Sequence, residues 1–200
     1  MALTKTNKLQ AINTMLSAIG EPPVNSLAAQ RADSLIAQTI LDETTRDILS
    51  YGWQFNTDEN VVMTPETTTG FIYISDSIVR VDIAPTDDTA ALEVVIRGNR
   101  LYNRLTSSYA FTEALTTTQV TLLDFDEVPE IAKRYITIRS ARIFQDRVVG
   151  SSTLHAFEMQ DEVSALARLT EYENEVGDYS IFQSESVIRP FLRQGSYRIY

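Results

Sequence analysis

Cysteine is absent from this 200-residue chain, and His155 is its only histidine. The missing thiols exclude disulfides, thiolate catalysis and cysteine-ligated zinc or iron–sulfur centres. One imidazole is too few for a site with several histidine ligands, and no triad-like motif surrounds His155, so we expect an ordinary surface or core residue. Glycine is scarce as well, with seven residues, and no glycine-rich loop of the phosphate-binding kind is present.

Long hydrophobic runs and an excess of positive charge are also missing. No apolar run reaches the roughly 20 residues that cross a bilayer, and no hydrophobic signal core follows Met1, so we expect neither membrane insertion nor secretion. Lys and Arg number 17 against 27 Asp and Glu, a net charge of −10. This charge repels nucleic acid at long range and disfavours a free DNA-binding protein. The 44% hydrophobic and 22% charged residues that are present are typical of a folded soluble chain.

The first 51 residues predict two helices. Apolar residues at spacings of three and four over 9–19 indicate one helical face, with Thr4, Thr6 or Asn7 as a cap and Gly20 as the end. A second helix is expected to begin after Ser26 and to run to about residue 51. Its predicted apolar positions are Leu35, Ile36, Ile40, Leu41, Ile48 and Leu49.

Residues 52–123 have the composition of a β region. They hold 13 of the 22 threonines of the chain, and threonine favours strands. Gly98 and Asn99 lie between two apolar runs and indicate a tight hairpin. The short alternating or apolar runs lie at 61–63, 71–74, 78–83, 92–96, 101–105 and 119–123. We therefore expect a small antiparallel sheet or barrel.

Helical periodicity returns after residue 128. One helix is predicted from Pro129 to about Val149, ending at Gly150, and another from Ser151 or Ser152 to Gly177. The predicted apolar positions of the last helix are Leu154, Phe157, Val163, Leu166, Tyr172 and Val176. The pattern predicts an α+β fold. Its expected parts are a helical core of two helical pairs (1–51 and 124–178), an inserted antiparallel β region (52–123) and an irregular C-terminal tail (179–200).

The two late helices carry opposite charge. The helix over 130–149 has five basic and two acidic residues, a net +3, and its basic and apolar residues surround the helix, as expected when neighbours contact several sides. The helix over 151–178 has one basic and seven acidic residues, a net −6. Two interpretations stay open: weak ion pairs within the chain, or a contact between subunits that uses Arg139, Arg142, Glu171 and Glu175.

Two smaller groups of residues each allow a structural interpretation and a functional one. Trp53 and Phe55 alternate around Gln54 like strand residues, and they either anchor the β region on the helical core or contact a partner. Acidic residues gather where a strand passes into a helix, at Asp124, Asp126 and Glu127. Helix capping accounts for them, and a metal or general-acid site is the alternative.

Several sequence blocks, in order along most of the chain, resemble the tail tubular protein A family. The blocks are 17–24 (SAIGEPPV), 52–56 (GWQFN), 101–104 (LYNR), 126–129 (DEVP), 135–136 (YI), 144–147 (FQDR) and Gly150. Asn103 stands where the family has aspartate, and the region after Gly177 carries little resemblance.

The resemblance implies a structural protein of the virion rather than an enzyme. The family forms the head-to-tail adaptor of short-tailed bacteriophages, a homo-oligomeric ring of usually twelve subunits between the portal protein and the tail nozzle of the tubular protein B type. Tail fibres attach around that junction, and double-stranded DNA passes through the bore without specific binding. We expect no cofactor and no membrane contact, with synthesis in the host cytoplasm and a final place in the tail.

The C-terminal tail combines arginines with aromatic residues and has no acidic residue after 185. One interpretation is a frayed terminus. The other, in the context of the resemblance, is an arm that binds the portal. The residues of this predicted arm are Arg189, Phe191, Arg193, Tyr197 and Arg198.

Two other functions compete with the adaptor ring. A carboxylate-based cell-wall hydrolase of the phage tail needs paired carboxylates in a cleft, and no spacing in the chain singles out such a pair. A cytosolic regulatory or interaction domain is the third candidate. Peptidoglycan turnover by the pure protein would favour the hydrolase, and failure to assemble with any portal would favour the third.

Overall fold

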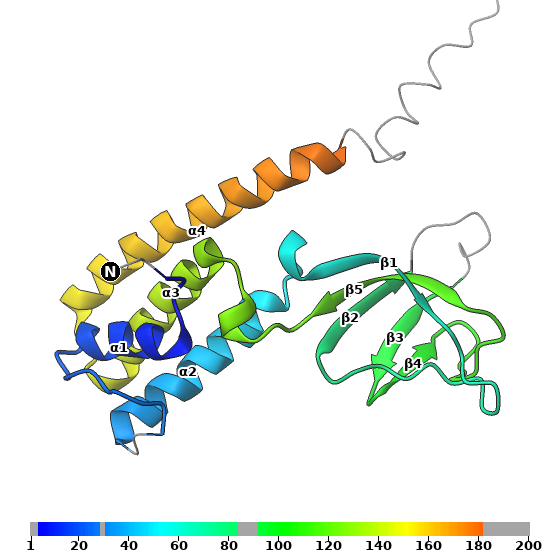
Figure 1. Ribbon diagram of the computed structural model, residues 1–200, viewed down its shortest axis with the longest axis horizontal. Helices are drawn as coiled ribbons and strands as arrows, with labels where there is room; N and C mark the ends of the chain where they lie inside the picture. The colour runs from blue at the N-terminus through cyan, green and yellow to red at the C-terminus, as the bar shows by residue number, and fades with distance from the viewer. Residues whose placement is uncertain (1–3, 29–30, 84–91, 182–200) are drawn as a thin grey trace, which may run out of the picture.

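The computed structural model describes residues 4–28, 31–83 and 92–181. Figure 1 shows two lobes, one helical and one built of strands, with a last helix that runs along the helical lobe and projects past it. This arrangement confirms the predicted α+β class. Within the described ranges, no helix combines the length and the apolarity that a membrane crossing requires.

Helix α1 (Lys8–Ala18) begins where its sequence predicts. The Asn7 side chain accepts a hydrogen bond from the Gln10 backbone, and the Gln10 side chain accepts one from the Asn7 backbone, which forms a capping box. After the helix, Gly20 adopts a φ of +80°, a left-handed conformation that glycine tolerates best. These local signals lie within one helix, and the sequence therefore reveals them.

Helix α2 (Ala32–Leu49) starts later than predicted. The expected start after Ser26 is wrong, because the helix begins after Arg31, whose side chain makes no capping hydrogen bond. Leu35 and Ile36 were expected in the core but are exposed. In the first turns of α2 the buried face is formed by the small residues Ser34 and Ala37, and Leu35 and Ile36 lie on either side of it. Ile40, Leu41, Ile48 and Leu49 are buried as predicted.

Helix α3 (Glu130–Val148) is the centre of the helical lobe. It packs against α1, α2 and α4, and between residues 131 and 146 only Arg134 is classed as exposed. The prediction of a helix contacted from several sides is confirmed. The hydrophobic core of this lobe includes Ile12, Leu41, Ile136 and Phe144.

Helix α4 (Ser152–Ile181) follows the turn at Gly150 and is longer than predicted. The expected end at Gly177 is wrong, because the helix continues through that glycine to Ile181. A glycine inside a helix costs only about 1 kcal/mol relative to alanine, so it does not by itself stop the helix. Of the tail predicted at 179–200, residues 182–200 lie outside the described residues.

The described residues of the β lobe, 57–83 and 92–121, form two small antiparallel sheets. Strands β1 (Thr57–Met63), β5 (Leu115–Thr121) and β2 (Ile78–Ile83) form one sheet in that order. Strands β3 (Val94–Arg97) and β4 (Arg100–Asn103) form the hairpin predicted at Gly98, which has a φ of +62°. The run at 71–74 makes isolated bridges rather than a strand of a sheet. A second hydrophobic cluster, which includes Ile72, Leu101 and Leu115, fills this lobe.

A short connection joins the lobes. Trp53 and Phe55 were expected to alternate as strand residues, but they flank and enter the 3₁₀ turn η1 (Gln54–Asn56). Both pack against the core of the helical lobe, which fits their expected role as anchors. Gly52 has a φ of +78°, and a Cβ atom there would lie 2.7 Å from the Arg80 Nη2 atom and 2.9 Å from the Val120 Cγ2 atom. The left-handed φ and the contact with Val120 of β5 therefore favour glycine at this position.

Candidate functional site

Helix α4 contacts the rest of the helical lobe along one narrow stripe, which we call the α4 seat. Its members recur at spacings of three and four, so they share one side of the helix. Ala165 and Leu169 are fully covered, and the other members are partly exposed. The α4 seat consists of His155, Glu158, Glu162, Ala165, Leu169, Tyr172 and Glu173. Because four of these seven side chains can carry charge, α4 is held largely by polar contacts.

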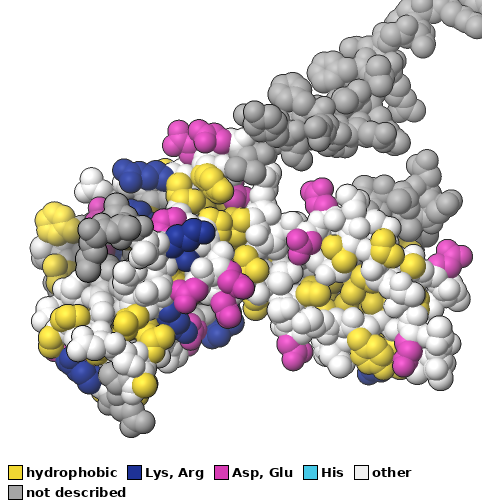
Figure 2. Space-filling view, in the orientation of Figure 1, with side chains coloured by type: hydrophobic (Ala, Val, Ile, Leu, Met, Phe, Trp, Pro, Cys, Tyr) yellow, Lys and Arg dark blue, Asp and Glu magenta, His cyan; other side chains and the backbone are white. Residues whose placement is uncertain are grey.

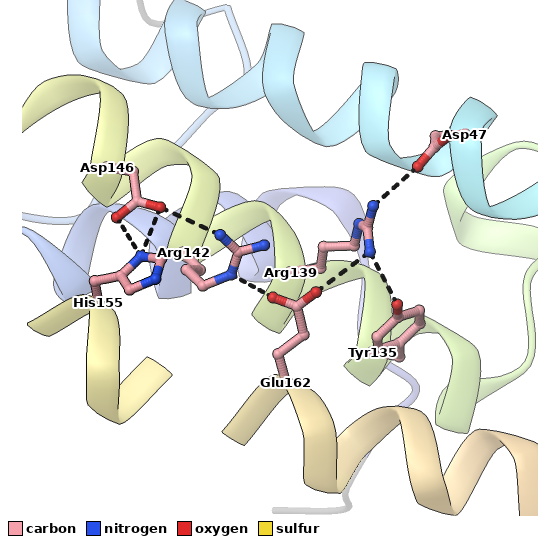
Figure 3. A network of polar contacts seen from close by, with 7 residues as sticks. All are labelled: Asp47, Tyr135, Arg139, Arg142, Asp146, His155 and Glu162. Carbon is pink, nitrogen blue, oxygen red and sulfur yellow. Dashed lines mark hydrogen bonds and ion pairs between the residues drawn. The ribbon is translucent and has the colours of Figure 1, made fainter. Parts of the chain in front are cut away.

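Two arginines of α3 hold Glu162 of α4, and one of them, Arg139, also reaches α2 (Figure 3). The Arg139 guanidinium lies 3.2 Å from an Asp47 oxygen on α2 and 3.3 Å from a Glu162 oxygen on α4. The Arg142 Nε atom pairs with the other Glu162 oxygen. Glu162 therefore accepts from both arginines, with its side chain only 12% exposed.

The same network continues to the single histidine. The Arg142 Nη1 atom lies 3.2 Å from an Asp146 oxygen. The His155 Nδ1 atom lies 2.9 Å from each oxygen of that carboxylate. Figure 3 shows the histidine on α4 facing Asp146 on α3. His155 thus has an acidic partner on α3 at the start of α4.

The network keeps both arginines charged. Hydrogen bonding to Glu162 raises the pKa of Arg142 despite opposing burial, and the charges of Glu162 and Asp146 add to the increase. Burial opposes the charged form of Arg139, but the hydrogen bond to Tyr135 and the charges of Glu162 and Asp47 outweigh it and raise its pKa. These guanidiniums are engaged within the chain.

Glu158 has the opposite electrostatic environment. Burial raises the pKa of its carboxyl group, and the nearby negative charge of Asp146 adds to the increase. The positive charge of Arg142 lowers the pKa but does not compensate. Within the described residues, the buried Oε2 atom of Glu158 has no hydrogen-bond partner. The α4 seat therefore includes an acid that is poorly solvated and poorly paired.

Beside the seat, α4 presents an apolar side to the exterior, which we call the α4 flank. Exposure is 53% for Met159, 60% for Val163 and 38% for Leu166. Val163 and Leu166 line a shallow, wide-open groove on the surface of α4 itself, together with Thr170, Glu171 and Glu175. Leu154 and Phe157, two of the predicted apolar positions of this helix, are exposed as well. Figure 2 shows hydrophobic surface next to acidic surface on the helical lobe.

A buried lysine fixes the entry of the chain into α1. Lys133 is 1% exposed, and its Nζ atom donates to the backbone carbonyls of Thr6 and Asp126 at 2.9 Å each. Nearby, Glu130 accepts from the Thr6 backbone at 3.0 Å and from the Thr6 hydroxyl. These hydrogen bonds lower the pKa of Glu130 despite partial desolvation. Nothing in the sequence distinguishes Lys133 from the adjacent Arg134.

The acidic group at 124–127 caps helical turns. The Asp126 side chain accepts from the Lys8 backbone, the first N–H of α1, at 2.9 Å. Asp124 and Glu127 form the capping pair of the short turn η2 (Phe125–Glu127). The structure supports the capping interpretation. Across the part of the chain that the structure describes, no group of three or more His, Asp or Glu side chains is arranged to hold a metal.

Arginines stack on aromatic rings at the surface of the β lobe. The Arg97 guanidinium lies 3.7 Å from the Tyr102 ring centroid, and that of Arg100 lies 4.5 Å from the Tyr109 centroid and 5.0 Å from that of Phe71. Such contacts stabilise by about 0.5–1 kcal/mol at exposed sites. The sequence gives no clear signal for this cluster, because Arg100 stacks on rings that are nine and 29 residues away in the chain.

The predicted interface residues fall into three groups. Arg139 and Arg142 are paired within the chain. This agrees with the interpretation of the charge pattern as ion pairs within the chain. Glu171 and Glu175 are exposed in the shallow groove on α4. The predicted portal-binding residues (Arg189, Phe191, Arg193, Tyr197 and Arg198) lie outside the described residues. A role for any of these residues between subunits stays a prediction.

Comparison with known proteins extends the resemblance to both lobes. A family model described as "Tail tubular protein" matches residues 9–179, from α1 almost to the end of α4. Tail tubular protein A of Klebsiella phage KP34 is 28% identical over 156 residues, which cover 78% of this chain and 81% of that protein. The family resemblance in the sequence blocks is thus confirmed, and this chain belongs to the tail tubular protein family.

Proposed function

We propose that this chain is one subunit of the adaptor ring that joins the portal to the tail nozzle and forms part of the DNA ejection channel. Membership of the tail tubular protein family makes it a structural component of a phage tail. The adaptor position is the finer statement and is our inference. The observation that carries it is the family match, which spans the helical lobe, the β lobe and most of α4.

The outer surface of the chain supports an assembly role. α4 is held on one stripe, and its other sides carry exposed apolar and acidic side chains available to neighbouring proteins. A closed ring needs two different patches on each subunit, because its contacts are heterologous. Candidate patches are the acidic end of α4, with Glu171 and Glu175, and the stacked arginine–tyrosine surface of the β lobe. Their opposite charges would favour one register.

The net charge suits a passage for DNA. Twelve copies at −10 each would carry a formal charge of −120. Carboxylates that face the bore would repel DNA, which carries about one charge per 1.7 Å of its axis. Dissolved salt screens this repulsion at distances beyond about 8–10 Å. This screening distance is comparable with the radius of a narrow channel. The expected effect is a wall to which moving DNA does not adhere.

Electron microscopy of the chain mixed with the portal protein of the same phage tests the proposal. We expect a ring stacked on the portal and absent from either protein alone. The matched variants are Glu171→Lys with Glu175→Lys, expected to weaken the ring, and Asp161→Lys, an exposed acid elsewhere on α4. A portal that stays bare at micromolar concentrations of both proteins would contradict the adaptor role.

Charge reversal at Arg139 and Arg142 is a poor test of the ring. Both side chains hold Glu162 of α4 against α3, so reversal would loosen α4 within the subunit before any neighbour is involved. Loss of assembly in that variant would not distinguish a subunit contact from damage to the α4 seat.

A further inference from the structure

The shallow groove on α4 combines exposed apolar side chains with acidic side chains toward the C-terminal end of the helix. Val163 and Leu166 line it with 60% and 38% of their surface exposed, and Glu171 and Glu175 lie along the same groove. Apolar side chains exposed side by side on one helix face are candidates for contact with another segment. The occupant that fits this chemistry is a cationic, apolar polypeptide segment.

The chain itself contains such a segment. Residues 186–200 (SVIRPFLRQGSYRIY) have three arginines, no acidic side chain and a majority of aliphatic and aromatic residues among the rest. Their charge is opposite to that of Glu171 and Glu175. Pro190 and Gly195 disfavour a continuation of the helix through the segment, so it is suited to lie along a groove in an extended form.

The segment is also within reach. Residue 186 follows the end of α4 at Ile181 by five residues, which span up to about 17 Å when extended. Along α4, Glu175 lies six residues before Ile181, a distance of about 9 Å at 1.5 Å per residue. A reversal after Ile181 therefore brings the segment beside Glu175, pointing toward Val163. Covalent attachment gives it an effective concentration in the millimolar range for a short linker.

We infer that, in the free subunit, residues 186–200 fold back into the groove of their own α4, with arginines at Glu171 and Glu175 and apolar side chains on Val163 and Leu166. This inference concerns the single chain and does not depend on the proposed ring. The same segment is predicted to bind the portal, so portal and groove would compete for it.

The natural chain has no cysteine. Any disulfide in a double-cysteine variant must therefore join the introduced cysteines, which permits a direct test. In full-length Thr170→Cys with Gln194→Cys, one cysteine lies in the groove and the other in the segment. The control pairs Gln194→Cys with Asp161→Cys, at an exposed position about 140–180° around the helix from Val163, Leu166 and Thr170. We expect an intramolecular disulfide to form at least tenfold faster in the first variant, measured by free-thiol titration and non-reducing electrophoresis.

A further substitution separates docking from random collision. Val163→Asp in the Thr170→Cys, Gln194→Cys chain should reduce the rate to that of the control, and Val79→Asp, at an exposed position in the β lobe, should leave it unchanged. Equal rates in the groove and control pairs would overturn the inference. So would preferential disulfide-linked dimers between singly substituted chains, because the occupant would then be a second copy.

Discussion

Lys133 and Arg134 are adjacent basic residues with opposite surroundings. Lys133 is 1% exposed and donates to two backbone carbonyls, whereas Arg134 is exposed. The carbonyls belong to Thr6 and Asp126, and Thr6 is 127 residues from the lysine in the sequence. No local pattern encodes such a pairing, and for this reason the sequence indicates five basic residues on this helix but not which one is buried.

Loss of the Lys133 ammonium should destabilise the helical lobe. Lys133→Met keeps most of the apolar stem but leaves the two carbonyls without donors, and each unsatisfied buried acceptor costs about 1–3 kcal/mol. We expect the free energy of unfolding to fall by about 2–5 kcal/mol in urea titrations. Arg134→Met is the matched control, expected within about 0.5 kcal/mol of the unsubstituted chain. Equal effects of the two substitutions would contradict the role of Lys133.

At the scale of elements, helices bounded by local signals could be predicted more fully than those bounded by tertiary contacts. The capping box at Asn7 marks the start of α1 in the sequence, and the hairpin at Gly98 is equally local. In contrast, α2 starts at Ala32 without a side-chain cap, and α4 continues past Gly177. The exposed apolar residues of α4 have helical spacing, but spacing cannot show that the side they mark has no intrachain neighbour.

The polar seat of α4 predicts a pH dependence. Folding raises the pKa of Glu158, which faces Asp146, Arg142, Asp161 and His155. The folded chain therefore binds this proton more tightly than the unfolded chain. The stabilisation from the protonated carboxyl is fully present below the unfolded pKa and is lost as the pH rises through the folded pKa. Glu158→Gln, which carries no charge, should raise the thermal midpoint at pH 7.

The gain from Glu158→Gln should disappear near pH 3, where the natural side chain is already protonated. Differential scanning calorimetry at the two pH values measures the difference between the variants. Asp161→Asn removes an exposed carboxylate of the same helix and is expected to change stability by less than about 0.5 kcal/mol at pH 7. A Glu158→Gln chain that is less stable at pH 7 would show that the carboxylate is favourably paired.

At the scale of the whole molecule, one buried side chain links the two lobes. The Asn56 amide donates to the carbonyl of Leu49 at the end of α2 and to that of Thr121 at the end of β5, both at 2.8 Å. Its side-chain oxygen accepts from the Trp53 backbone at 2.9 Å. The α+β class and the order of elements could be predicted from the sequence, but this three-way contact could not, because it depends on how the lobes meet.

Asn56→Ala should uncouple the lobes. Three backbone groups lose their hydrogen-bond partner. Because the helical and β lobes have separate hydrophobic clusters, the two lobes should then unfold less cooperatively. We expect a single calorimetric transition in the natural chain and a broadened or split transition in the variant. Asn99→Ala, at an exposed position in the β3–β4 turn, is the control. An unchanged sharp transition in Asn56→Ala would mean that other contacts couple the lobes.

Because α3 is enclosed by α1, α2 and α4, the helical lobe has a buried centre and an outer layer of exposed side chains. With Arg134 as its only exposed side chain between residues 131 and 146, α3 has almost nothing to offer to another protein. Among the described residues, exposed side chains are found instead on α4, on the outer sides of α1 and α2, and in the β lobe. A phage could change its tail partners by altering these surfaces while the centre of the helical lobe stays the same, so assembly specificity and fold can evolve at different rates.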